Sequence, residues 1–174
     1  MSRWWRLIVA HKAVAAILTA VLLLPVSGMI LSRAMDGRTA VVGRVIDGDT
    51  LDVEYGGATH RVRLLNVDTP ETVNPGRPVQ CLGPEAAEFL RQRLPAGSPI
   101  RMRFDQDRYD RYGRELAAVF AQRSLINAEI ARAGFGVAVL YEPNDRFYAL
   151  VLSAQKDAER RQIGLHSPDS GCTP

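Results

Sequence analysis

Residues 40–67 read AVVGRVIDGDTLDVEYGGATHRVRLLNV and predict three short β-strands in tandem. Residues 40–46 are rich in Val and Ile, and residues 51–55 alternate apolar and acidic side chains with the period of two that half-buried strands have. A third strand over residues 59–67 follows Gly56-Gly57, a dipeptide that favours a hairpin turn. Three consecutive strands joined by tight turns indicate a small antiparallel barrel or meander.

Two more strands and three helices are expected after this stretch. Gly83-Pro84-Glu85 opens the first helix, which runs to about residue 94, because proline at the first position and an acid in the first turn favour a helix start. The other expected elements are strands over 100–104 and 115–121, a short helix over 124–133 capped by Ser124, and a final helix over 145–163 that ends at Gly164. This order indicates an α+β fold, a barrel with helices packed at its side and end.

The composition fits one globular domain of ordinary size within 174 residues, and the two cysteines rule out a disulfide scaffold. The formal net charge is +3, but residues 1–38 carry five basic residues and one acidic residue, a net charge of +4. The other 136 residues therefore carry a net charge of −1. Net charge does not argue for binding to nucleic acid, because the basicity belongs to the N-terminal segment.

Residues 1–38 form a hydrophobic leader. Nineteen residues, 13–31, carry no charge and follow Arg3, Arg6 and Lys12. A helix of that length nearly crosses a hydrocarbon core of about 30 Å. Two interpretations remain open: a signal peptide that is cleaved, or a membrane anchor that is kept. Either one places the rest of the chain outside the cytoplasmic membrane, secreted or anchored.

Cys81 and Cys172 are the two cysteines of the chain. Outside the cytoplasmic membrane a disulfide between them could persist, and two unpaired structural cysteines are the alternative. If the chain is exported, we expect the two to pair and to tie the C-terminal tail to the loop over residues 68–82.

Acidic residues and arginines gather at the predicted turns and strand ends. Asp47 and Asp49 lie in the first turn, and Asp68-Thr69-Pro70-Glu71 follows the third strand. Arg63 lies inside the third strand, five residues before Asp68, and Arg114 directly precedes the strand over 115–121. Each feature alone is more often a structural turn or a surface ion pair. Together they match the needs of metal-assisted phosphodiester cleavage, because carboxylates hold Ca²⁺ and arginine contacts phosphate through two donors.

Several blocks of the sequence resemble the staphylococcal nuclease (thermonuclease) family in their order and spacing. The blocks are Ile46-Asp47-Gly48-Asp49-Thr50, Arg63-Leu64-Leu65, Val67-Asp68-Thr69-Pro70-Glu71-Thr72, Gly83-Pro84-Glu85-Ala86, Tyr112-Gly113-Arg114 and Tyr141-Glu142-Pro143-Asn144. The resemblance implies an OB-type five-stranded β-barrel with three helices. It divides the chain into the leader at 1–38, a thermonuclease-like domain at 39–166 and a C-terminal tail at 167–174.

The resemblance further implies a Ca²⁺-dependent nuclease that cleaves DNA and RNA with little sequence specificity and yields 3′-phosphates. Asp49 and Asp68 would ligate Ca²⁺ through their side chains, and Thr69 through its backbone carbonyl. Asp47 would support this metal site without contacting the ion.

The remaining implied roles concern catalysis and substrate binding. Glu71 would orient or deprotonate the attacking water, and Arg63 and Arg114 would hold the phosphate that is cleaved. The residues that would bind the rest of the nucleotide are Arg111, Tyr112 and Tyr141.

A non-catalytic barrel that binds oligonucleotide or a protein partner is the alternative function. The presence of all five acidic and arginine residues of the implied active site favours the enzyme, because a cluster of like charges without a metal is unfavourable. The expected partners are DNA and RNA as substrates, and the membrane if the leader is kept. We expect a monomer.

Overall fold

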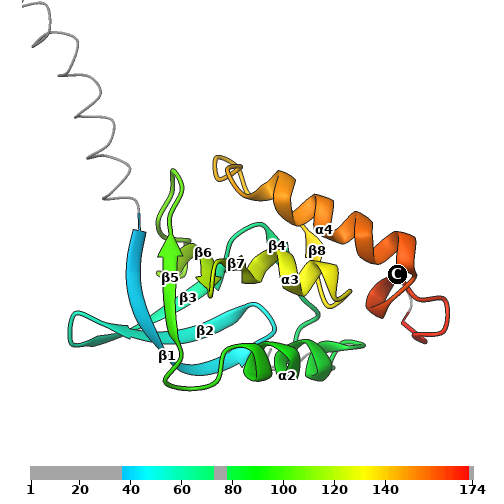
Figure 1. The fold of residues 1–174 in the computed structure, drawn as a ribbon, viewed down its shortest axis with the longest axis horizontal. Coiled ribbons are helices and arrows are strands. Elements are labelled where there is room, and N and C mark those ends of the chain that lie inside the picture. Colours follow the sequence, from blue (N-terminus) through cyan, green and yellow to red (C-terminus); the bar gives the residue numbers. More distant parts are fainter. Residues whose placement is uncertain (1–36, 73–77, 173–174) are drawn as a thin grey trace, which may run out of the picture. The chain divides into compact units, whose positions relative to one another are not determined.

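The computed structural model describes residues 37–72 and 78–172 (Figure 1). The predicted leader lies outside the described residues except for its last two, which belong to the first strand. Its two interpretations therefore stay predictions. Within the described ranges, no helix has both the length and the apolar character that crossing a membrane requires.

Five strands close into a barrel. β1 (Gly37–Asp47), β2 (Thr50–Tyr55) and β3 (Ala58–Leu64) form the expected antiparallel meander. β5 (Pro99–Arg103) pairs with β1, and β6 (Glu115–Ala121) pairs with β5. Parallel pairing of β3 with β6 then closes the sheet on itself. A closed five-stranded barrel with three helices is the expected OB-type architecture.

Three α-helices and several short elements lie outside the barrel. They are β4 (Val67–Asp68), α2 (Gly83–Arg93), β7 (Ser124–Leu125), α3 (Ile126–Arg132), β8 (Val137–Ala138), α4 (Tyr148–Arg161) and the 3₁₀-helix η1 (Gly164–His166). α2 packs against β1, whereas α3 and α4 pack against each other beside the small β4–β8 pair (Figure 1).

The core fills the barrel and continues under the helices. Leu51 and Val53 of β2 and Val62 and Leu64 of β3 are fully buried, as period-two alternation predicts. Leu90 of α2 is also fully buried. Burial of each such side chain contributes about 1.5–3 kcal/mol relative to exposure, so the alternation fixes which strand faces turn inward.

The third strand is shorter than predicted. It ends at Leu64, because Asn66 adopts φ 58° and turns the chain before β4. Asparagine tolerates this left-handed conformation better than most residues. The Asn66 side-chain amide also donates to the backbone carbonyl of Asn144 at 2.8 Å, a contact that stabilises the turn. Local periodicity does not report a bond between residues so far apart in the sequence.

The ends of the last two helices also differ from the prediction. Ser124 belongs to β7 and does not cap α3, which begins at Ile126. α4 spans Tyr148–Arg161 rather than 145–163, and it ends before Gly164 because Gln162 adopts a left-handed φ of 50°. Gly164 instead begins η1.

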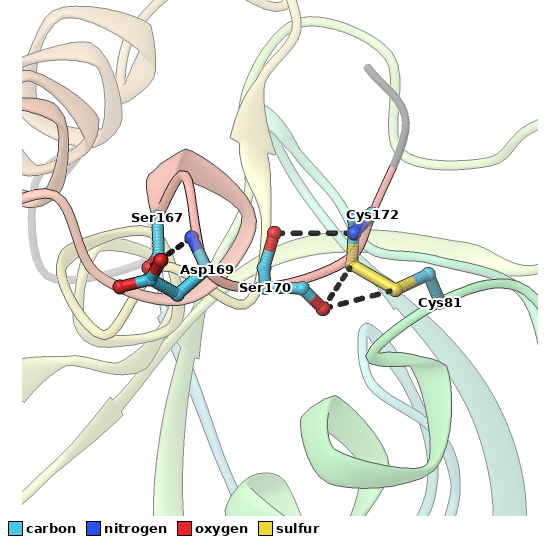
Figure 2. Close-up of a disulfide and its surroundings, with 5 residues drawn as sticks. All are labelled: Cys81, Ser167, Asp169, Ser170 and Cys172. Carbon is cyan, nitrogen blue, oxygen red and sulfur yellow. Dashed lines mark hydrogen bonds between the residues drawn. A yellow bond between two sulfur atoms is a disulfide. The ribbon is translucent and has the colours of Figure 1, made fainter.

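A disulfide joins Cys81 to Cys172 (Figure 2). Their Cα atoms lie 5.5 Å apart, and the Cys172 N–H donates to the Ser170 hydroxyl at 3.2 Å. The expected pairing is therefore confirmed. The bond connects the C-terminal tail to the residues that precede α2.

Removal of this disulfide should destabilise the fold. The cysteines are 91 residues apart, and closing a loop of that size stabilises by up to about 4–5 kcal/mol in the chain-entropy model. Urea denaturation of the Cys81→Ser/Cys172→Ser double variant should show a loss approaching this limit. Thiol titration of the unfolded, non-reduced wild type should find almost none, and two titratable thiols would contradict the pairing.

Candidate functional site

The ten residues predicted to form the site all line one cleft of about 780 Å³. The walls come from the β1–β2 turn, the ends of β3 and β4, the segment before β6 and the turn before α4. The predicted residues in the cleft are Asp47, Asp49, Arg63, Asp68, Thr69, Glu71, Arg111, Tyr112, Arg114 and Tyr141. The fold thus brings together residues that are far apart in the sequence.

The β1–β2 turn requires glycine at its centre. A Cβ atom on Gly48 would lie 2.7 Å from Thr69 Oγ1 and 2.8 Å from Ala86 Cβ, closer than real side chains approach. Asp47 accepts hydrogen bonds from the Gly48 N–H and from the Thr72 hydroxyl, both at 2.8 Å. Asp47 therefore joins the turn to the loop that follows β4.

Asp49 is 5% exposed, and its carboxylate is surrounded by donors. Oδ2 accepts from the N–H and the hydroxyl of Thr69, both at 2.9 Å, and Oδ1 accepts from the Thr50 hydroxyl at 3.0 Å. Arg63 Nη1 lies 2.9 Å from Oδ2. Burial raises the pKa of Asp49, while Arg63 and the Thr69 donors oppose the rise. Asp49 is a carboxylate with little stabilisation from water and one close positive charge.

Arg63 connects the two aspartates of the predicted metal site. Its buried guanidinium donates from Nη2 to Asp68 Oδ1 at 2.5 Å and from Nη1 to the Val67 carbonyl at 2.8 Å. One guanidinium therefore contacts both carboxylates and bridges Asp49 to Asp68. The Asp68 side chain is 51% exposed, so its carboxylate is open to the cleft.

Glu71 lies at the start of the loop after β4 and is partly buried. Its N–H donates to Gln80 Oε1 at 2.7 Å, and its carbonyl accepts from the Gln80 N–H at 3.0 Å. The Glu71 carboxylate accepts from the Thr72 N–H at 3.1 Å. Gln80 directly precedes Cys81, so these bonds and the disulfide hold Glu71 near the beginning of α2.

Asp110 organises the opposite wall. Its Oδ1 accepts from the N–H groups of Tyr112 and Arg114, both at 2.9 Å, and its Oδ2 accepts from Arg114 Nε at 2.6 Å. Gly113 completes this turn with φ 79°, a conformation that favours glycine. Burial alone would raise the pKa of Asp110, but the donors of Arg114 and Tyr112 outweigh it and the pKa is lowered.

Arg111 and Tyr112 form the outer rim of this wall. Arg111 Nη2 donates to the Tyr112 hydroxyl at 2.6 Å, and its guanidinium lies 4.8 Å from the ring centroid. Tyr112 is 68% exposed, and the Arg114 guanidinium also lies 5.5 Å from its ring centroid, so the rim combines positive charge with an exposed aromatic ring.

Tyr141 closes the cleft on a third side. Burial raises the pKa of Tyr141, Arg63 opposes the rise, and Asp68 and Asp49 add to it, so the phenol is protonated at neutral pH. The buried Asn144 holds this turn, because its N–H donates to the Tyr141 carbonyl at 2.7 Å and its side chain donates to the Asp107 carbonyl at 3.0 Å.

Among the described residues, no three His, Cys, Asp or Glu side chains lie together so that they could hold a metal ion. The predicted ligand set contains only two carboxylates, with a backbone carbonyl as its third member, and so falls below that number.

The sequence of this chain matches one protein family over more than half of its length. The model of the staphylococcal nuclease homologues matches residues 61–168. The chain belongs to the staphylococcal nuclease family.

Relatives in this family match over most of the chain. The chain is 40% identical to the thermonuclease of Staphylococcus intermedius over 134 residues, which are 77% of this chain and 79% of that protein. It is 39% identical to the thermonuclease of Staphylococcus hyicus over 137 residues, which are 79% and 80% of the two proteins. It is 35% identical to endonuclease YncB of Bacillus subtilis (strain 168) over 126 residues, which are 71% of this chain and 59% of that protein.

Sequence reasoning missed several residues that shape the cleft of this family member. Asp110 belongs to no quoted block, and Asn144 closes a quoted block but was given no role; both orient other residues. Asn66 bonds across 78 residues of sequence, which no local pattern records. Arg61 did have a signal, because it lies two residues before Arg63 and therefore on the same face of β3.

The Asp110→Asn variant tests the organisation of the wall. Its free energy of unfolding at neutral pH should fall by about 1–3 kcal/mol, because the amide cannot accept all three hydrogen bonds equally well. The pKa of Asp110 is lowered in the folded state, so its carboxylate stabilises the fold above the unfolded-state pKa of about 3.9 and loses that effect as pH falls below it. In urea denaturation, the difference from wild type should therefore shrink at about pH 3.

The same substitution at Asp145, an exposed residue before α4, controls for the loss of charge. A difference for Asp110→Asn that stays constant over this pH range would contradict the assigned role of the carboxylate.

Proposed function

We propose that this chain is a Ca²⁺-dependent nuclease that hydrolyses DNA and RNA with little sequence specificity and yields 3′-phosphates. Its relatives are named thermonucleases and an endonuclease, which makes it a phosphodiesterase, a hydrolase of ester bonds. The observation that carries the proposal is the contact of Arg63 with both Asp49 and Asp68 in a cleft that also holds Glu71 and Arg114.

The residues present fit Ca²⁺. The carboxylates of Asp49 and Asp68 are bridged by Arg63, one buried and one open to the cleft, and Thr69 follows Asp68 directly. Carboxylate and carbonyl oxygens are the donors that Ca²⁺ prefers, and the ion commonly completes its shell with water. Asp49, Asp68 and the Thr69 carbonyl would hold it, with Asp47 fixing the turn behind Asp49. Bound there, Ca²⁺ would offset the negative charge that builds on the phosphate during cleavage.

The arginines and Glu71 supply the remaining functions. Arg114 donates from Nε to Asp110, so its two Nη groups can donate to a phosphate. Arg63 donates to carboxylate oxygens, and the anionic oxygens of a phosphate accept hydrogen bonds from arginine in the same way. Glu71 orients or deprotonates a water that attacks phosphorus opposite the 5′ oxygen. The bond from phosphorus to that oxygen breaks, the 5′ oxygen takes a proton, and the phosphate stays on the 3′ side.

The disulfide supports a location outside the cytoplasm, because disulfides persist in oxidising compartments and are rare in the cytosol. We infer an exported enzyme, secreted or anchored through residues 1–38, that acts as a monomer.

Substitution of the two catalytic groups should separate catalysis from binding. Glu71→Gln keeps the shape of the side chain but removes the base, and Arg114→Lys keeps the charge but loses the planar fork. Each should lower the turnover of an oligonucleotide by about 100-fold or more, while affinity for the nucleotide with Ca²⁺ changes far less. If the chain only binds nucleic acid, the wild type will show no Ca²⁺-dependent cleavage and Glu71→Gln will change nothing.

Substitution of a metal ligand should have the reverse effect. Asp49→Asn should weaken Ca²⁺ binding by roughly tenfold or more, since ligand charge sets affinity. Isothermal titration of the folded variant with Ca²⁺ measures this. Asp52→Asn is the matched control, because Asp52 is equally buried and paired with arginine but lies outside the predicted ligand set. Equal losses in the two variants would contradict the ligand assignment.

A further inference from the structure

A second hollow of about 490 Å³ adjoins the cleft. It is lined by Asp52, Thr59, Arg61, Tyr112, Gly113 and Arg114. Arg61, Tyr112 and Arg114 line the cleft as well. These three residues form the boundary that the two spaces share, so a polymer bound in the cleft can continue across it into the hollow.

Alternate residues of β3 lead from one space to the other. Arg63, Arg61 and Thr59 are two positions apart, so their side chains lie on the same face of the strand. Arg63 lines the cleft, Arg61 lines both spaces, and Thr59 lines the hollow. Alternate side chains of a strand are about 7 Å apart, which is the scale of one nucleotide in an extended single strand.

Asp52 fixes Arg61 without cancelling the positive charge. It lies opposite Arg61 in the β2–β3 register and accepts from Arg61 Nε at 2.7 Å and Nη2 at 3.1 Å. Arg44 Nε donates to the same carboxylate at 2.9 Å, so two arginines share one aspartate. The Arg61 hydrogen bond is the main reason that the pKa of Asp52 is lowered, and the group carries a net positive charge at neutral pH.

The orientation of Arg61 leaves donors for a ligand. Because Nε and Nη2 form the edge that meets Asp52, the Nη1 group points away from that carboxylate. The Arg61 side chain is 44% exposed. A guanidinium that is held in place and partly hydrated needs little reorganisation to bind an oxyanion.

We propose that Arg61 binds a second backbone phosphate of a single-stranded polynucleotide, one nucleotide away from the phosphate that is cleaved. This inference rests on the proposed nuclease function and deepens it. Tyr112 lies at the boundary of the two spaces and is 68% exposed beside the guanidinium groups of Arg111 and Arg114, and an exposed aromatic ring can contact an unpaired base, which favours a single strand over a duplex. Such a contact matters in this chain, because residues 39–174 carry a net charge of −1 and attract polymer weakly as a whole.

The test compares Arg61→Gln with its parent for two ligands, a dinucleoside monophosphate and a single strand of roughly ten nucleotides, within the site size of an OB-fold. Binding is measured by fluorescence anisotropy with Ca²⁺ in the Glu71→Gln background, so that the ligand is not consumed. The preference for the longer ligand should fall about tenfold, because one charge-assisted contact is lost. The slope of log affinity against log salt should become shallower by about 0.7.

Arg44→Gln and Arg101→Gln are the controls. Arg44 donates to the same carboxylate but lines neither space, and Arg101 is an exposed arginine of β5 that also lines neither. Both should keep the preference for the longer ligand. An equal loss for Arg44→Gln and Arg61→Gln would overturn the proposal in favour of general electrostatic attraction, and an unchanged preference in Arg61→Gln would overturn it outright.

If Arg61→Gln does not fold, Arg61→Lys keeps the charge and loses the fork, and it should still lower the preference for the longer ligand; an unchanged preference in that variant overturns the proposal. If the wild type cleaves neither ligand, the proposed nuclease function fails, whereas the binding comparison still decides the role of Arg61.

Discussion

The contact of one buried guanidinium with two carboxylates holds this site together. Arg63 reaches Asp49 from the β1–β2 turn and Asp68 from β4 while its own backbone belongs to β3. A charge as buried as Asp49 is costly unless it is paired and hydrogen-bonded, and Arg63 with Thr69 provides both. Pairing of β3 with β6 brings Arg114 to the same side of the barrel. β3 therefore carries both the strand pairing that closes the barrel and the arginine that joins the two carboxylates.

Polar contacts, rather than apolar packing, shape the walls around that pair. Asp110 turns the segment before β6 so that Arg114 enters the cleft, and Asn66 with Asn144 holds the turn that carries Tyr141. Gln80 accepts from the Glu71 N–H, and the disulfide at the neighbouring Cys81 fixes the position of Gln80, so both hold Glu71 in place. Asn66 and Asn144 are buried and donate to backbone carbonyls, so their substitution would leave those carbonyls without a partner.

Much of this could be predicted from local patterns. Alternation in residues 51–55 identified β2, and the aspartates flanking Gly48 identified the turn, because both signals lie within a few residues. The end of β3 at Leu64 and the missing cap of α3 could not, since they depend on Asn66 and on pairing of β7 with β6. The acidic residues and arginines of the cleft stood out at the predicted turns and strand ends, whereas the roles of Arg111, Tyr112 and Tyr141 came only from the resemblance to a family. Arg61 shares a strand face with Arg63, but its role could not be predicted because the hollow forms only where β3 meets the Tyr112–Arg114 segment.

The most direct measurement is cleavage of a single-stranded oligonucleotide by the purified protein, with Ca²⁺ and with a chelator, followed by analysis of the product ends. A nuclease built on Asp49, Asp68 and Arg63 should cleave with Ca²⁺, stop with the chelator, and leave phosphate on the 3′ ends and hydroxyl on the 5′ ends. Binding without cleavage, cleavage that persists in the chelator, or 5′-phosphate products would contradict it.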